Sequence, residues 1–333
     1  MPFVRPIFLS PTLSPASAAR VLLLAEGFVE GMRGSFFSAC TTAVEKLLSI
    51  TPFNTARSQG WLSVFAHFTA SSQPGPAPWD APRDTAFRSR FDPGKRVLTV
   101  DPDAVAEALA ALEVADPSGS GASRPASQLW PAGEAAVPAL IAVFLPPALE
   151  SQPLSCECEW SPDPAGTSPA QVRFVATSTD AGFEWILARE LGRAFGLGDE
   201  WEAAGPGFTA PSLGATMQLS AFRNLTTFLD PSSAQGPGFD WWDEESPAQR
   251  RNPPAPAPHP GDPATPDLSL PATPFTDPFL QVVEGGGGYR TLVRRPARDC
   301  LMRRQVGGAL SPKLHPAPFC VLCRRLLTRT FAG

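Results

Sequence analysis

The stretch that decides the fold runs from Phe183 to Trp201 and reads FEWILARELGRAFGLGDEW. Its apolar side chains recur with the three- and four-residue spacing of a helix that buries one face. These side chains are Phe183, Ile186, Leu187, Leu191, Ala194 and Phe195. Gly196 and Gly198 end the helix, because glycine adopts the left-handed conformation without steric cost. The sequence therefore predicts a buried helix and then a turn that returns Asp199 toward it.

Zinc peptidases use a helix of this layout. In the His-Glu-x-x-His pattern the histidines at i and i+4 bind one metal, and the glutamate activates the metal-bound water. Glu190 occupies the place of that glutamate and Asp199 that of a third ligand, but Arg189 and Arg193 stand at both histidine positions. A guanidinium stays protonated and has no lone pair for zinc. We therefore expect no metal at positions 189, 193 and 199.

The same stretch resembles the motif of the IgA-peptidase-like zinc metallopeptidases, a zincin family, which runs roughly H-E-x-G-H-x-[FL]-G-L-x-D-E-[YW]-E. The matching residues are Glu190, Gly192, Phe195, Gly196, Leu197, Asp199, Glu200, Trp201 and Glu202. Further pieces resemble the family in the same order: Leu22–Phe28, Phe37–Leu48, Pro52–Phe53, Leu62–Ser72, Arg223–Thr227, Trp241–Trp242, Tyr289–Arg290, Cys300–Arg303 and Phe319–Cys323. The resemblance implies a degenerate, catalytically inactive member in which Glu190 is vestigial.

The order of strand-like and helix-like segments independently favours a layered α/β domain with a partly parallel sheet. Strands are expected at 20–26, 61–69, 96–100, 138–146 and 171–178, and helices at 36–50, 104–112 and 320–331. The resemblance implies a zincin-like sandwich with a twisted mixed sheet, an active-site helix and a small C-terminal subdomain, with Met302 beneath the site.

Four regions follow from these patterns: an N-terminal extension at 1–19, the zincin-like domain at 20–202, a proline-rich irregular insertion at 203–284 and the C-terminal subdomain at 285–333. Proline accounts for 40 of the 333 residues, against about 5% in average proteins. Many of these prolines fall between Asn252 and Pro278, where no periodicity is seen.

The composition argues against two classes of partner, nucleic acid and a membrane. The net charge is −5 and there is no long basic run, so nucleic acid is not an expected partner. No apolar run approaches the roughly 18 residues that a membrane span needs. There is no clear signal peptide, so a cytoplasmic location is the default expectation, although the resembled family is often secreted.

Arg189 and Arg193 lie at i and i+4, where like charges destabilise a helix by about 0.2–0.5 kcal/mol. We therefore expect that solvent or a carboxylate offsets this repulsion. The two arginines either form a solvated basic face or pair with Asp199 in the vacated site. Two arginines and an aspartate sum to +1, as do two neutral histidines, an aspartate and Zn²⁺. Glu190 has no metal-bound water to deprotonate, so its simplest role is that of a buried carboxylate paired with an arginine.

Near the C-terminus, Cys300, His315, Cys320 and Cys323 are four possible zinc ligands within 24 residues. Structural zinc ligands and disulfide-forming or plain buried thiols are both open interpretations. No cofactor is expected at the catalytic position. The chain has three histidines in all, so no substitute histidine triad is available.

The favoured function is that of an inactive peptidase homologue whose former active-site cleft binds a peptide or protein. One alternative is an active peptidase or hydrolase with a non-standard site. Another is a structural or interaction protein that acts through its proline-rich segment.

Overall fold

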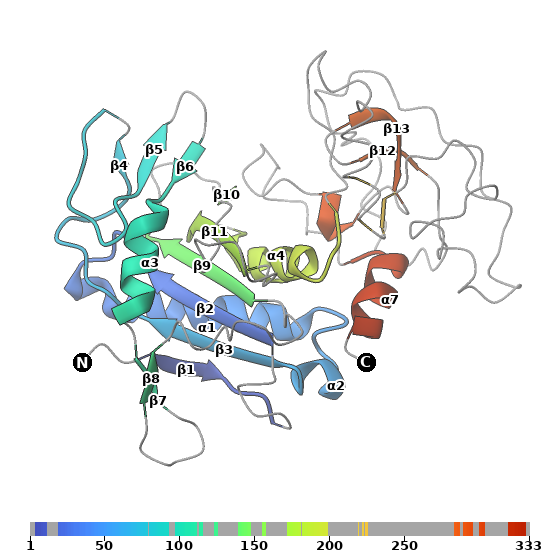
Figure 1. Cartoon of the computed structure of the whole chain (residues 1–333), viewed down its shortest axis with the longest axis horizontal. Helices are drawn as coiled ribbons and strands as arrows, with labels where there is room; N and C mark the ends of the chain where they lie inside the picture. Colours follow the sequence, from blue (N-terminus) through green and yellow to red (C-terminus); the bar gives the residue numbers. More distant parts are fainter. Residues whose placement is uncertain are drawn as a thin grey trace, which may run out of the picture. The chain divides into compact units, whose positions relative to one another are not determined.

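The computed structural model describes residues 4–11, 19–78, 80–92, 97–111, 113–115, 123–125, 139–147, 155–157, 172–180, 182–198, 219, 222, 224, 225, 283–286, 289–295, 300–303 and 319–330 (Figure 1). The chain forms two compact units. The first comprises residues 1–194 and 306–312, and the second residues 195–305 and 313–333. Each is described by itself.

A six-stranded mixed sheet forms the centre of the first unit, in the order β1-β3-β2-β9-β11-β10. Its strands are β1 (Arg5–Phe8), β2 (Ala19–Ala25), β3 (Leu62–His67), β9 (Ala139–Leu145), β10 (Ser155–Glu157) and β11 (Val172–Ser178). The four inner strands are parallel, and the edge strands β1 and β10 pair antiparallel. Inner strands that are buried on both faces are expected to be continuous apolar runs, and residues 21–25, VLLLA, form such a run.

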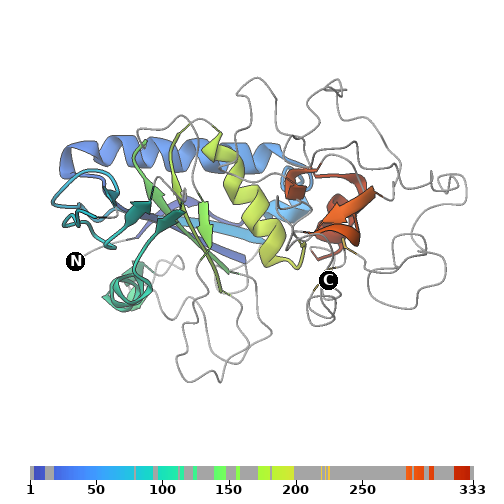
Figure 2. The same ribbon diagram turned by 90° about the horizontal axis from the view of Figure 1, so that it is seen from above.

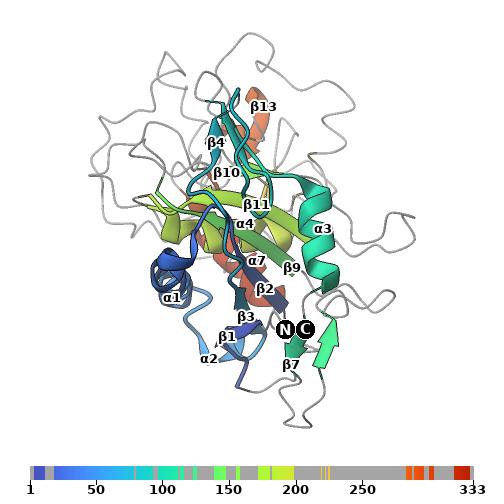
Figure 3. The same cartoon turned by 90° about the vertical axis from the view of Figure 1, so that its left-hand side faces the viewer.

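Helices cover both faces of this sheet. Helix α1 (Arg33–Ser49) and helix α4 (Ile186–Ala194) contact each other, and α4 packs on β9 and β11. Helix α3 (Pro102–Ala111) lies on the opposite side of the sheet from α1, as Figures 2 and 3 show. The carboxylate of Asp101 caps α3 by accepting hydrogen bonds from the N–H groups of Asp103 and Ala104 at 3.0 and 3.4 Å.

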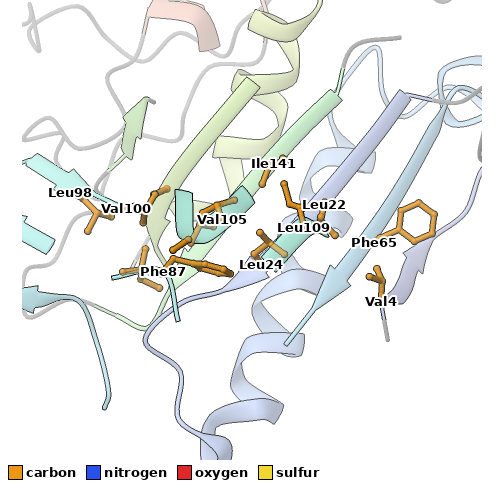
Figure 4. Close-up of a cluster of buried hydrophobic side chains, with 14 residues drawn as sticks. Val4, Leu22, Leu24, Phe65, Phe87, Leu98, Val100, Val105, Leu109 and Ile141 are labelled. Carbon is orange, nitrogen blue, oxygen red and sulfur yellow. The ribbon is translucent and has the colours of Figure 1, made fainter. Parts of the chain in front are cut away.

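The core on the α3 side is a single apolar cluster that joins the sheet to α3 and to the segment before it (Figure 4). Its members are Val4, Leu22, Leu24, Phe65, Phe87, Leu98, Val100, Ala104, Val105, Leu109, Ile141, Val143, Leu145 and Ala176. Alternate residues of the strands supply it, because successive side chains point to opposite faces. On the other face α1 buries Phe36, Cys40, Ala43, Val44 and Leu47.

Short elements complete the first unit. They are η1 (Glu30–Met32), α2 (Ala56–Gln59), the three-stranded sheet of β4 (Ala77–Pro78), β5 (Arg90–Asp92) and β6 (Val97–Thr99), and the hairpin of β7 (Glu113–Ala115) and β8 (Ser123–Pro125). In the second unit, β12 (Val283–Gly286) pairs antiparallel with β13 (Tyr289–Arg295), and η7 (Leu301–Arg303) and α7 (Val321–Thr330) follow.

A tight junction forms where β2 ends. The buried carboxylate of Glu26 accepts hydrogen bonds from the backbone N–H groups of Phe87 and Ser89 at 2.6 and 2.9 Å. Gly27 has φ +70°, and its carbonyl accepts from the N–H of Gly75 at 2.8 Å. A Cβ at Gly27 would lie 2.9 Å from the backbone C and O of Gly75. This close approach requires glycine at position 27.

We therefore expect Gly27→Ala to lower the free energy of unfolding by roughly 1–3 kcal/mol, from the left-handed φ and from overpacking against backbone that cannot move aside. Gly34→Ala is the matched control, because Gly34 lies in α1 and its Cβ would meet nothing within 4 Å. That change should be neutral or stabilising by up to about 1 kcal/mol. Chemical denaturation of both variants is the measurement, and equal effects would contradict the account of the junction.

The structure confirms the α/β class and the main elements expected from the sequence. The predicted helix at 36–50 is α1, and the strand predicted at 138–146 is β9. Residues 5–8, which the sequence analysis placed in an extension, form edge strand β1. The first compact unit includes the chain up to Ala194, while the boundary predicted at 202 and most of the proline-rich insertion lie outside the described residues. In the described part of the chain, no helix has the length and apolar character of a membrane span.

Candidate functional site

Helix α4 is the centre of the candidate site, and its start is fixed by packing. The 3-10 turn η3 (Phe183–Trp185) precedes it, after Gly182 with φ +91°. The Phe183 ring packs edge-on against Phe144 of β9, with centroids 5.7 Å apart. The Lys46 ammonium of α1 lies 3.8 Å from the centroid of the Trp185 ring, a cation–π geometry. These contacts hold the helix between the sheet and α1.

Polar side chains are buried in α4. Glu190 is fully buried, and Arg189 is 3% exposed. The Glu190 carboxylate forms an ion pair with the Arg189 guanidinium, and the Arg193 Nη1 atom lies 3.6 Å from its second oxygen. The Arg193 side chain is 13% exposed. The carboxylate is thus placed between two guanidinium groups and away from solvent.

This geometry confirms the interpretation of Glu190 as a buried carboxylate paired with an arginine. Neither arginine lies on a solvated face. The predicted partner of the arginines, Asp199, lies outside the described residues, so its pairing stays a prediction. The donor set that α4 presents is one carboxylate between two permanent cations, which does not fit zinc because neither guanidinium offers a lone pair.

The turn after α4 is bound within the second unit by an asparagine. Gly196 has φ +88°, as expected for a glycine that ends a helix. The Asn224 Oδ1 atom accepts from the N–H of Gly198 at 2.6 Å, and Asn224 Nδ2 donates to the carbonyl of Gly198 at 2.9 Å. Asn224 is fully buried. A Cβ at Gly198 would lie 2.7 Å from both Leu225 Cδ1 and Phe222 Cγ, so only glycine fits here without movement.

Three cysteines of the second unit form a cluster. The Sγ atoms of Cys300, Cys320 and Cys323 all lie within 4.8 Å of one another, and the three buried residues form no disulfide. The backbone N–H of Cys320 donates to Cys300 Sγ at 3.3 Å. Burial raises the pKa of the Cys300 and Cys323 thiols well above the usual range. His315, the fourth ligand type named from the sequence, lies outside the described residues.

Apolar residues near the three cysteines along the chain are buried as well. Met302, Phe319, Leu322 and Leu327 are all fully buried. Cys300 directly precedes η7, while Cys320 directly precedes α7 and Cys323 lies in its first turn. Two short elements therefore carry the three sulfur atoms, which are close enough to bind a single metal ion.

A cavity of about 380 Å³ opens in the first unit beside β4 and β5. Arg83, Arg88 and Arg90 line it together with Asp84 and the buried Ser89. The Arg88 guanidinium is held by Asp101 at 2.9 Å, and Arg83 donates to the carbonyl of Pro74 at 2.7 Å. None of the residues singled out from the sequence lies in this cavity.

Sequence reasoning missed the role of Asn224 and the packing of the three thiols. Asn224 belongs to an Asn-Leu-Thr tripeptide, which by pattern alone suggests a surface glycosylation site, whereas its amide is buried against Gly198. The sequence analysis did group Cys300 with Cys320 and Cys323, and the fold brings their three sulfur atoms within 4.8 Å of one another. Comparison with models of known protein families and with curated proteins finds no match to this chain.

Proposed function

We propose that this chain is a catalytically inactive relative of the IgA-peptidase-like zinc metallopeptidases, with a zincin-like sandwich, and that it acts by binding a peptide or protein rather than by cleaving one. The observation that carries the proposal is the environment of Glu190. A general base must reach the proton that it removes, directly or through one water molecule. Glu190 is fully buried and ion-paired to Arg189 and, at 3.6 Å, to Arg193.

The charge of the site supports the same proposal. A zinc peptidase supplies a divalent cation that lowers the pKa of its bound water. In α4 the positive charge comes instead from Arg189 and Arg193, which neutralise the carboxylate but cannot bind or activate water as a metal does. On this proposal, the two arginines supply positive charge beside the carboxylate, as a metal ion would, but they do not activate water. On this proposal, any metal in the chain is structural zinc at the cysteines.

A variant with histidine at both arginine positions tests the proposal. We expect Arg189→His with Arg193→His to bind about one more zinc ion per chain than the parent, because residues at i and i+4 share a helix face. The parent should leave an unfolded protein substrate such as casein intact. The variant should cleave it weakly, through Glu190.

Arg189→Gln with Arg193→Gln is the matched control: it removes the same charges without adding ligands, so it should bind no additional zinc. Zinc content by elemental analysis and casein cleavage by electrophoresis are the measurements. Cleavage of casein by the parent, lost on adding Glu190→Gln, would overturn the proposed inactivity. A folded double histidine variant with no additional zinc would show that α4 and residue 199 lack the geometry of a metal site.

A further inference from the structure

We infer that Cys300, Cys320 and Cys323 form a three-thiolate site for a thiophilic divalent cation such as zinc, and that the folding of the second unit depends on that cation. The inference rests on the metal location proposed above and does not depend on α4.

The geometry supports one shared ion. Zinc–sulfur bonds of about 2.3 Å in a tetrahedral arrangement place sulfur atoms about 3.8 Å apart. The three Sγ atoms lie within 4.8 Å of one another, so small rotations would bring them to that spacing. A disulfide would join only two of the sulfur atoms and leave the third as a buried thiol. The three cysteines supply three of the four ligands that zinc takes in a tetrahedral site.

The local charges favour thiolates once a cation is present. Binding breaks three S–H bonds, forms three metal–sulfur bonds and releases three protons to solvent. The complex of three thiolates and a divalent cation carries a charge of −1. The N-terminus of α7, where Cys320 and Cys323 lie, carries positive partial charge. The N–H of Cys320 also donates to Cys300 Sγ, which stabilises the thiolate form.

The donor atoms restrict the metal. Thiolates are soft ligands that select zinc and similar thiophilic ions, whereas magnesium and calcium require oxygen ligands. The three cysteines are themselves buried away from solvent, as are Met302 and Phe319 next to them in the sequence. The site is therefore expected to discriminate strongly against magnesium and calcium.

The dependence of folding on the metal is inferred from where the three thiols lie. Cys300 directly precedes η7, Cys320 directly precedes α7, and Cys323 lies in the first turn of α7. One ion bound to all three would therefore tie η7 to α7. Because a metal site is rarely preformed in an unfolded chain, the free energy of binding the ion then adds to the free energy of folding.

Hydrogen exchange resolved by peptide tests this inference in the full-length chain. The purified protein should contain about one zinc ion, and cadmium in its place should give a sulfur-to-metal charge-transfer band. Removing zinc with a chelator should speed amide exchange in α7 and β13 by about tenfold or more, while β2 and β9 keep their protection. Added zinc should restore the slow exchange, and added magnesium should not.

Cys323→Ser should lose the zinc, and Cys40→Ser is the matched control because Cys40 is a buried free thiol in α1 of the first unit. If the parent binds neither zinc nor cadmium, the site does not exist. If it binds zinc but α7 exchanges equally slowly without it, the dependence of folding on metal is overturned and the site stands. Neither outcome involves peptide cleavage, so the proposed inactivity is judged separately.

Discussion

Replacing Glu190 by glutamine is expected to lower the free energy of unfolding by about 3–5 kcal/mol, because it removes the charge of a buried carboxylate that pairs with Arg189 and Arg193. The Arg189 side chain is 4% exposed and cannot reach water. Glutamine keeps the size of the side chain, so the effect reports charge rather than packing. Arg193→Gln should cost less, since Arg193 is 13% exposed and its loss leaves the Arg189–Glu190 pair intact. Chemical denaturation followed by circular dichroism measures all of these changes.

Two further variants make this prediction specific. Glu30→Gln is the matched control, because Glu30 pairs with Arg33 at 2.8 Å on the surface, where the side chains are 65% and 56% exposed. Its effect should be about 0–1 kcal/mol. Arg189→Met combined with Glu190→Leu should be nearly neutral, since apolar residues can replace a buried ion pair. A Glu190→Gln protein as stable as the Glu30→Gln protein would contradict the buried ion cluster.

The second large effect is expected at Asn224. Asn224→Leu should lower the free energy of unfolding by roughly 2–6 kcal/mol, or about 1–3 kcal/mol for each buried backbone group left without its hydrogen bond. Both groups belong to Gly198, whose N–H and carbonyl pair with the Asn224 amide at 2.6 and 2.9 Å. Leucine has a similar size but neither donates nor accepts. The measurement is chemical denaturation, together with the hydrogen-exchange rate of the peptide that contains Gly198.

Asn54→Leu is the matched control, because Asn54 is exposed in the first unit. Surface substitutions of this kind usually change stability by no more than about 0.5 kcal/mol. If Asn224→Leu behaves like Asn54→Leu, or if the Gly198 amide exchanges no faster, the amide pairing does not stabilise the turn.

The sequence predicted those helices and strands whose hydrophobic pattern lies within one short segment of the chain. The run VLLLA at 21–25 and the helical spacing after Phe36 mark β2 and α1 without any tertiary information, and Gly196 ends the helix as its conformational freedom predicts. Edge strand β1 was not predicted. Its pairing with β3 joins residues more than fifty positions apart in the sequence, and no short window contains that information.

In the candidate site, too, the residue types could be read from the sequence, but only some of their contacts could. The sequence shows arginines at the two positions where the His-Glu-x-x-His pattern has histidines, and a guanidinium has no lone pair for zinc. The sequence analysis expected Glu190 to be a buried carboxylate paired with an arginine, and the structure pairs it with Arg189. The expected pairing of the arginines with Asp199 lies outside the described residues and stays a prediction. The sequence did not decide whether the arginines form a solvated face, because burial depends on how α4 packs against the sheet.

The same limit applies to Glu26 and Cys300. Nothing near Glu26 in the sequence indicates that its carboxylate accepts hydrogen bonds from Phe87 and Ser89, about sixty residues later. The sequence analysis named Cys300 with Cys320 and Cys323 as candidate ligands, but it did not show that their three sulfur atoms lie within 4.8 Å of one another. These contacts are set by tertiary packing, which a single sequence does not display.

X-ray absorption at the zinc edge of the zinc-loaded parent chain tests the central claim most directly. The account predicts about one zinc ion with a first shell dominated by sulfur at about 2.3 Å, and no second zinc bound by nitrogen and oxygen alone. A zinc-free chain would refute the cysteine site but leave the inactive helix in place. A zinc ion held only by nitrogen and oxygen at about 2.0–2.2 Å would contradict the account of α4.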